Sequence, residues 1–221
     1  MGVATRPDWP IPAALIVLAA IPVVAGSVRL TQLAGGAPPT ADTIRFVAAP
    51  IPVIVHIIGA TLYSIVGAFQ FAPGLRRRFP AWHRVAGRVL VLAGLAAALS
   101  GIWMALFYAI VPADHVLLHW FRLAAGTGMA GALILGLLAI RRRDVATHQA
   151  WMRRAYAIGM GAGTQALFLL PPMLLFGSID DLTRALLMGA AWGVNLAVAE
   201  WLIRRPRRAA ARSVAASTSA G

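Results

Sequence analysis

Six apolar segments of 15 to 29 residues, none of which contains Asp, Glu, Lys or Arg, dominate the 221-residue chain. They run Ile11–Val28, Val47–Leu75, Val89–Ala113, Leu123–Ile140, Ala155–Ile179 and Ala185–Ala199. A helix needs about 20 residues to cross the hydrocarbon core of a bilayer. The fourth segment reaches that length by starting near Leu117, and the last by continuing to Ile203. Strands of a membrane barrel alternate in shorter segments, so the pattern predicts an all-α polytopic membrane bundle with six transmembrane helices.

Composition excludes several other classes of protein. Charged residues make up 12% of the chain, with a mean hydropathy of +0.77, whereas soluble domains carry about 25% charged residues. The absence of cysteine excludes disulfides, thiol catalysis, cysteine–zinc sites and iron–sulfur clusters. The net charge of +13 could suggest nucleic acid as a partner, but the hydropathy favours the lipid bilayer instead, with no nucleic acid.

The placement of arginine predicts how the helices are oriented. All 20 basic residues are Arg, and 16 of them are Arg6 or lie in clusters after the second, fourth and sixth segments. Basic residues mark the cytoplasmic side of a membrane. We therefore expect both termini in the cytoplasm of a bacterial cell, with a membrane domain at 1–205 in the inner membrane and a disordered basic tail at 206–221. The remaining arginines are Arg29, Arg45, Arg122 and Arg184.

The first segment has two interpretations. It follows Arg6, and Ala25-Gly26-Ser27 could serve as a cleavage site for a secreted precursor. The apolar core of a signal peptide is about 7–15 residues long, and this segment is longer. A retained first helix is therefore favoured over a cleaved signal.

An internal repeat joins the middle segments. Arg76-Arg77-Arg78 is followed by His83 and Arg88, and Arg141-Arg142-Arg143 by His148 and Arg153, with the same spacing and an offset of 65 residues. The pattern predicts that helices 2–3 and 4–5 are duplicated and form a parallel repeat about the membrane normal.

Four histidines share this arrangement. His56 and His119 precede the two arginine runs by 20 and 22 residues, which places them at a similar depth on the outer side. His83 and His148 open helices 3 and 5 on the inner side. Small residues follow each histidine at helical spacing. These stripes either let helices pack closely or leave room for a flat porphyrin beside its ligand.

Three motifs carry a resemblance to a known family. Gly67-Ala68-Phe69-Gln70-Phe71, His83-Arg84-x-x-Gly87-Arg88 and His148-x-x-Trp151-Met152-x-Arg154 resemble the signature of a bacterial family of predicted membrane proteins of unknown function, over residues 50–170. Gln165 stands in the region of helix 5 where this pattern leads us to expect a further Arg. The resemblance implies a fold but no established activity.

The placement of one histidine on each of four consecutive helices is similar to the two-haem transmembrane cytochrome b family of the ascorbate-reducible type. This likeness implies that His56 and His119 bind an outer haem b, and that His83 and His148 bind an inner one. Arg122, and Arg84 or Arg88, would then pair with haem propionates. Tyr63, with Gly67 and Gly126, would line the outer gap.

Three functions follow as hypotheses. The leading one is a b-type haem protein, a possible membrane oxidoreductase, that passes electrons across the membrane or to a quinone or another redox partner. The alternative is a non-catalytic scaffold, accessory subunit or lipid-binding protein without a cofactor. A third is transport of a small solute or metal at the repeat interface. The chain has no Ser/His/Asp set, phosphate loop or paired carboxylates, which argues against a hydrolase or nucleotide enzyme.

Overall fold

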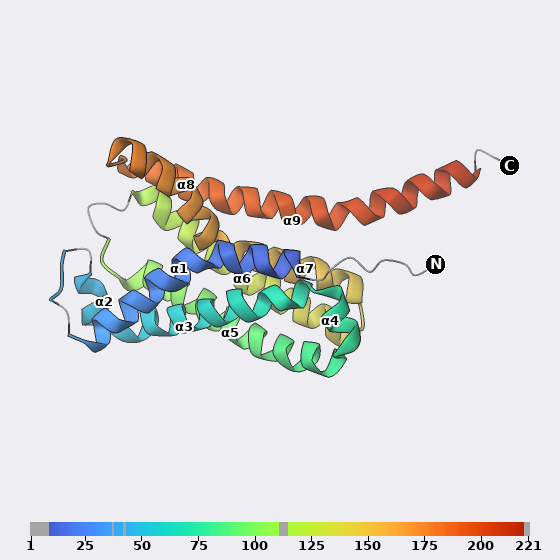
Figure 1. Ribbon diagram of the computed structural model, residues 1–221, viewed down its shortest axis with the longest axis horizontal. Coiled ribbons are helices and arrows are strands. Elements are labelled where there is room, and N and C mark those ends of the chain that lie inside the picture. Colours follow the sequence, from blue (N-terminus) through green and yellow to red (C-terminus); the bar gives the residue numbers. More distant parts are fainter. Residues whose placement is uncertain (1–8, 37, 42, 111–114, 219–221) are drawn as a thin grey trace.

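The protein is a bundle of long helices (Figure 1). The computed structural model describes residues 9–36, 38–41, 43–110 and 115–218, with side chains described up to Arg205. In chain order the elements are α1 (Pro10–Ala34), α2 (Ile44–Ala48), α3 (Pro50–Ala68), the 3-10 helix η1 (Phe69–Phe71), α4 (Pro73–Arg78), α5 (Pro80–Phe107), α6 (Val116–Arg141), α7 (Val145–Gly159), α8 (Gly161–Phe176) and α9 (Asp181–Thr218).

Six helical stretches in the described residues are long and apolar enough to cross a membrane. They are α1, α3 with η1, α5, α6, α7 with α8, and the Asp181–Arg205 part of α9. This confirms the predicted all-α bundle with six spans. Beyond the expected end of the membrane domain, the backbone of α9 stays helical to Thr218 and extends away from the bundle (Figure 1). The boundary between domain and tail at 205/206 stays a prediction.

Local sequence explains where several helices begin and end. Proline opens α1, α3 and α5, where its missing N–H and restricted φ angle carry no penalty. The Asp144 side chain accepts a hydrogen bond from the Thr147 backbone N–H and caps α7. Gly177 ends α8 with a φ of 74°, a conformation that glycine adopts without strain.

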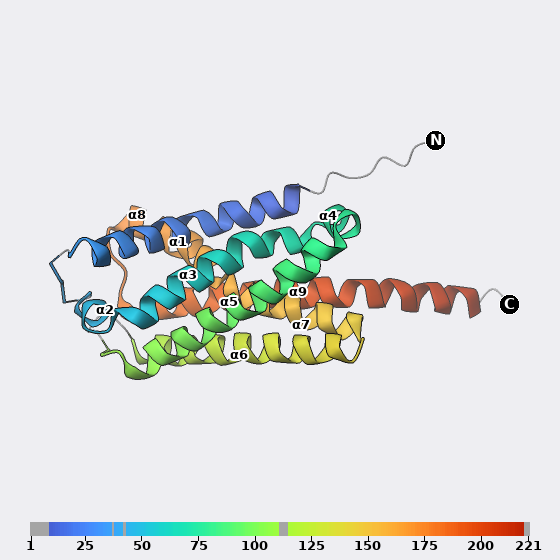
Figure 2. The same ribbon diagram turned by 90° about the horizontal axis from the view of Figure 1, so that it is seen from below.

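The two ends of the bundle differ in their connections. Short links at one end, α4 and the turn at 142–144, carry the two arginine runs, and α1 begins at this same end (Figures 1 and 2). We call it the arginine-rich end. The other end carries α2 and the long connection between α1 and α3, and we call it the α2 end.

Four helices form a closed ring in the arginine-rich half. Neighbours around the ring are α3 and α5, α5 and α6, α6 and α7, and α7 and α3. In this order α3 lies diagonally across from α6, and α5 lies diagonally across from α7. The helices α1 and α9 pack outside the ring, α1 against α3 and α9 against α6 and α7.

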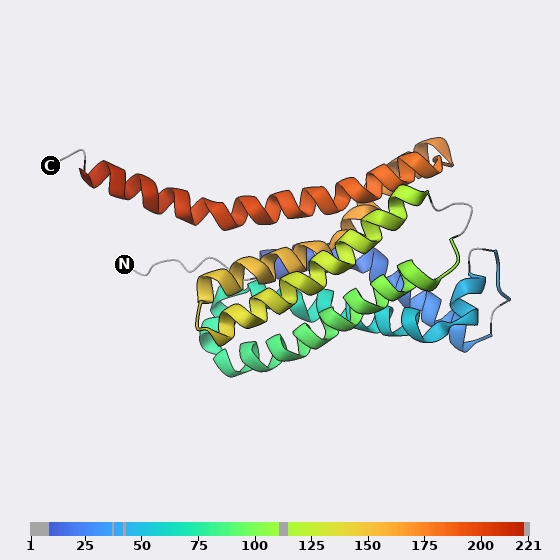
Figure 3. The same ribbon diagram turned by 180° about the vertical axis from the view of Figure 1, so that it is seen from behind.

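The fifth span breaks at Met160, between Gly159 and Gly161. Its second half, α8, leaves the ring and packs against α1 and α9 (Figure 3). The break frees the backbone carbonyls of Ala157 and Ile158, which accept hydrogen bonds from the Asn195 amide and the Trp192 indole of α9. Polar groups inside a membrane need such partners. Pro171 and Pro172 lie further along the span, within α8.

The segments that we expect to be duplicated form two helical hairpins, α3 with α5 and α6 with α7. The backbone N–H groups of His83 and His148 bond to Phe79 and Asp144, four residues earlier in each case. The hairpins also differ, because η1 and α4 join the first pair and a tight turn joins the second. The predicted repeat about the membrane normal stays a prediction.

Candidate functional site

The four predicted histidines lie at two levels of the bundle. His83 and His148 are the fourth residues of α5 and α7, at the arginine-rich end. His56 and His119 lie on α3 and α6 in the half nearer the α2 end. Each pair therefore comes from helices that are diagonal in the ring, but only the arginine-rich level is closed by all four of its helices.

His83 and His148 both lie in the first turn of a helix at the arginine-rich end, where the His83 ring is within electrostatic range of Arg76, His148 and Arg84. The Nδ1 atom of His148 lies 2.8 Å from the Gly136 carbonyl oxygen on α6. A carbonyl only accepts hydrogen bonds, so Nδ1 carries the proton, and a neutral ring then presents its lone pair on Nε2. The Nδ1 atom of His83 is buried and has no hydrogen-bond partner among the described residues.

Open space lies beside this level of the ring. Gly87 follows His83 by one helical turn on the same face of α5, and a methyl group added to it would meet no described atom within 4 Å. By contrast, a methyl group on Gly136, beside His148, would collide with Met152. Gly131 in α6 and Gly193 in α9 likewise meet no described atom within 4 Å, so open space adjoins some glycines of this bundle and not others.

A glutamine missed as a site residue lies at the same level. Along the α3–α5 contact, His56 meets Ala97, and Gly59, one turn on, meets Ala93. Following this antiparallel register to the end of α3 places Gln70, in η1, level with His83. The Nε2 atom of Gln70 is buried and lacks a hydrogen-bond partner among the described residues. Gln70 belongs to the first of the three sequence motifs, but it is not among the site residues predicted from the sequence.

The second level is more tightly filled. The Nδ1 atom of His56 lies 2.8 Å from the Ala97 carbonyl oxygen and 3.4 Å from the Ser100 hydroxyl, both on α5. The His119 ring is half-buried and makes an edge contact with Trp120, at 5.6 Å between ring centres. A methyl group added to Gly126 would meet Ile102 at 2.6 Å, so a side chain already fills the space beside this glycine.

Tyr63 lies between the two levels. Its ring packs against Gly94 and Gly159, and it contacts the Tyr156 ring at 5.6 Å between centres. Tyr156 in turn covers Gly67 and donates a hydrogen bond to the Ser64 carbonyl. Here the small residues allow close packing of side chains. They leave no gap beside Tyr63 of the kind that the sequence led us to expect.

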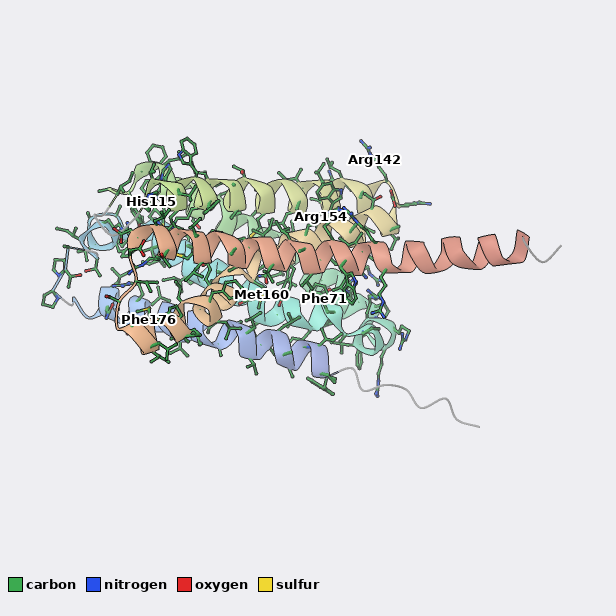
Figure 4. All side chains as sticks on the ribbon, turned by 90° about the horizontal axis from the view of Figure 1, so that it is seen from above. Phe71, His115, Arg142, Arg154, Met160 and Phe176 are labelled. Carbon is green, nitrogen blue, oxygen red and sulfur yellow. The ribbon has the colours of Figure 1, made fainter. Side chains whose placement is uncertain are left out.

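The predicted arginines occupy different environments. Arg84 and Arg88 are exposed, whereas Arg122 is half-buried. Arg154, from the third motif, donates a hydrogen bond of 2.5 Å to Glu200 on α9 and stacks over Trp151. Figure 4 shows Arg154 on the arginine-rich side of Met160, beside α9. This pair joins α7 to α9, a structural role that the motif alone did not reveal.

A conventional metal site of several side chains is absent from the described part of the chain. No group of three or more His, Cys, Asp or Glu side chains is placed there to hold a metal ion. Any metal chemistry at the two levels would therefore rest on pairs of imidazoles.

Comparison with known proteins identifies the family. No curated protein and no solved structure matches this chain. A family model described as "Predicted membrane protein (DUF2306)" matches residues 53–203, a range that includes all three sequence motifs. The chain therefore belongs to this family of predicted membrane proteins.

Proposed function

We propose that this protein is a membrane-embedded b-type haem protein that carries electrons, with His83 and His148 as its main ligand pair. The observation that carries the proposal is the arginine-rich level, which contains a buried nitrogen without a described partner and open space beside it. A buried imidazole nitrogen of His83 lacks a partner among the described residues, His148 lies in the first turn of the diagonal helix at the same end, and open space adjoins Gly87, one turn after His83.

The chemistry of the two side chains fits this role. Metal-binding histidines commonly donate their other ring N–H to a backbone carbonyl, which fixes the tautomer and the orientation of the ring. His148 makes such a bond to Gly136, and its Nε2 atom is left for a ligand. Two imidazoles on one haem iron leave no open position, so the bound group would supply one-electron transfer rather than oxygen activation.

His56 and His119 form the second proposed pair. His56 has its tautomer set by the Ala97 carbonyl in the same manner. Ile102 occupies the space beside Gly126, so a second haem would require this side chain to turn away. The fit of the residues is therefore better at the arginine-rich level than at the other.

The orientation and partners belong to the same proposal. We propose that the arginine-rich end faces the cytoplasm of a bacterial cell, because Arg76–Arg78 and Arg141–Arg143 gather there. Both termini would then be cytoplasmic in the inner membrane. A quinone or a protein redox partner would exchange electrons with the site.

An absorption spectrum tests the proposal. Protein purified from haem-replete cells should show a Soret band and an alpha band that respond to reduction. His83→Ala and His148→Ala should lose these bands, while His115→Asn, which alters the helix-capping histidine of α6, should keep them. A colourless protein, or bands that survive in every histidine variant, would overturn the proposal and favour the cofactor-free scaffold.

A further inference from the structure

A cavity at the α2 end has no part in the proposed haem sites. It has a volume of about 150 Å³ and lies between the last turns of α1, the connection to α2, and α2 itself. Its walls combine a guanidinium from Arg29, the amide of Gln32 and the hydroxyls of Thr40 and Thr43 with the apolar side chains of Phe46 and Val47. The lining is therefore amphipathic, with one fixed cation.

Two arginines contact Phe46, although only Arg29 of the two lines the cavity. The guanidinium carbons of Arg29 and Arg45 lie 5.2 and 5.0 Å from the centre of the Phe46 ring. Arg29 also donates a hydrogen bond of 2.9 Å to the Gln32 side chain. Cation–π contacts and this bond hold the Arg29 guanidinium at the cavity wall, where its other N–H groups are available to an anion.

The surroundings indicate that the anion comes from the membrane. α1, which ends at Ala34, is a candidate membrane span, so its last turns lie where lipid headgroups begin. Ile44 and Val47 of α2 and Val28 of α1 are exposed apolar side chains beside the cavity. Apolar side chains at the boundary between headgroups and hydrocarbon can contact acyl chains, so these residues suit a position beside a bound lipid.

We propose that this cavity binds the phosphate group of an anionic phospholipid, with Arg29 as its charged partner. Its volume suits a headgroup phosphate rather than a whole lipid, so the acyl chains would run outside it, along α1 and α2. Thr40 and Thr43 line the same cavity. Their hydroxyl oxygens lie 3.0 Å apart and share one hydrogen bond, so one of the two hydroxyl protons is left to donate to a phosphate oxygen. Asp42, in the same connection, lies outside the described residues.

Lipid retention in mass spectra of the intact protein tests this proposal. When the protein is ejected from nanodiscs of phosphatidylcholine and phosphatidylglycerol in the mass spectrometer, it should retain bound phosphatidylglycerol. Arg29→Gln should bind this lipid about tenfold more weakly, the effect of losing a charge-assisted interaction. Arg184→Gln, which removes the same charge near the start of α9 at the same end of the bundle, should bind it as the unaltered protein does.

The controls separate the source of the phosphate and the integrity of the fold. Phe46→Leu removes the ring that holds Arg29, and should also weaken retention if Arg29→Gln proves unstable. Equal loss in Arg29→Gln and Arg184→Gln would overturn the proposal. Inorganic phosphate that binds at Arg29 as tightly in lipid-free detergent would overturn the assignment to a lipid. Because the readout is lipid, a failed haem test leaves this result unaffected.

Discussion

The arginine-rich level and the level of His56 each contain a pair of histidines on diagonal helices, but the two pairs differ in hydrogen bonding and in the packing around them. At the arginine-rich level, the ring is closed by α7, the His83 Nδ1 atom has no described partner, and the space at Gly87 is open. At the other level, α8 has left the ring, His56 bonds to α5, and Ile102 fills the space beside Gly126.

This difference shows that burial of a polar residue does not by itself mark a binding site. A histidine within a membrane is costly to bury and usually functional, which by itself favours His56 as a site residue. The carbonyl of Ala97 and the hydroxyl of Ser100 satisfy its ring within the protein. His83 is the better candidate, because its buried nitrogen has no described partner. Burying a polar atom without a hydrogen bond destabilises the protein, and a bound ligand would remove that cost.

The largest expected effect concerns haem content. His83→Ala or His148→Ala should abolish most of the haem absorbance, because each removes a ligand at the level with open space. His56→Ala and His119→Ala should reduce it less. Haem per protein, measured by the pyridine haemochrome spectrum, checks the ranking. A larger loss in His56→Ala than in His148→Ala would reverse the comparison of the two levels.

The next largest effect is a difference in the stability of the haem-free protein between glycine-to-alanine substitutions at a filled position and at an open one. Gly59 lies one turn from His56, and a methyl group there would meet the Ala93 backbone oxygen at 2.8 Å. Gly59→Ala should therefore destabilise the protein by about 2–3 kcal/mol through overpacking.

Gly87 provides the matched substitution at the other level. Gly87→Ala should leave stability unchanged or raise it by up to about 1 kcal/mol, since alanine is the better helix former. Thermal unfolding of the haem-free protein in one detergent measures both variants. Similar losses at the two positions would show that the space at Gly87 is not open.

Substitution of Gln70 should change the stability by a smaller amount, and the direction of the change is informative. Gln70→Leu removes a buried donor that has no described partner, so it should stabilise the haem-free protein by about 1 kcal/mol. The same thermal unfolding experiment gives the sign of the change. A loss of stability of that size would mean that the amide is already satisfied, and Gln70 would then leave the candidate site.

The smallest effect concerns the link between the arginine-rich half and α9. Glu200→Gln weakens the bond to Arg154 and should cost less than about 1 kcal/mol, because both side chains are partly exposed and solvent screens the pair. High salt should narrow the difference from the unaltered protein. A cost of several kcal/mol, independent of salt, would contradict this placement at the surface of the bundle.

Sequence patterns predicted the six spans well because each is a local property. Length and the absence of charge define a membrane helix, and Pro50 and Pro80 open α3 and α5 at the positions that proline tolerates. The break at Met160 was not predicted. Two glycines flank it in a sequence that contains many glycines, and its stability depends on Asn195 and Trp192, more than 30 residues away.

The sequence by itself determined that this chain is a helical membrane bundle and along which segments its helices run, because hydropathy is a property of the local chain. Only the tertiary structure decided which of the histidines have a hydrogen-bond partner and which glycines face open space. Gly59, Gly87 and Gly126 are alike in sequence, but their surroundings come from Ala93, from open space and from Ile102. Those neighbours depend on how the helices pack against one another, and a local sequence pattern does not specify contacts between residues that are far apart in the chain.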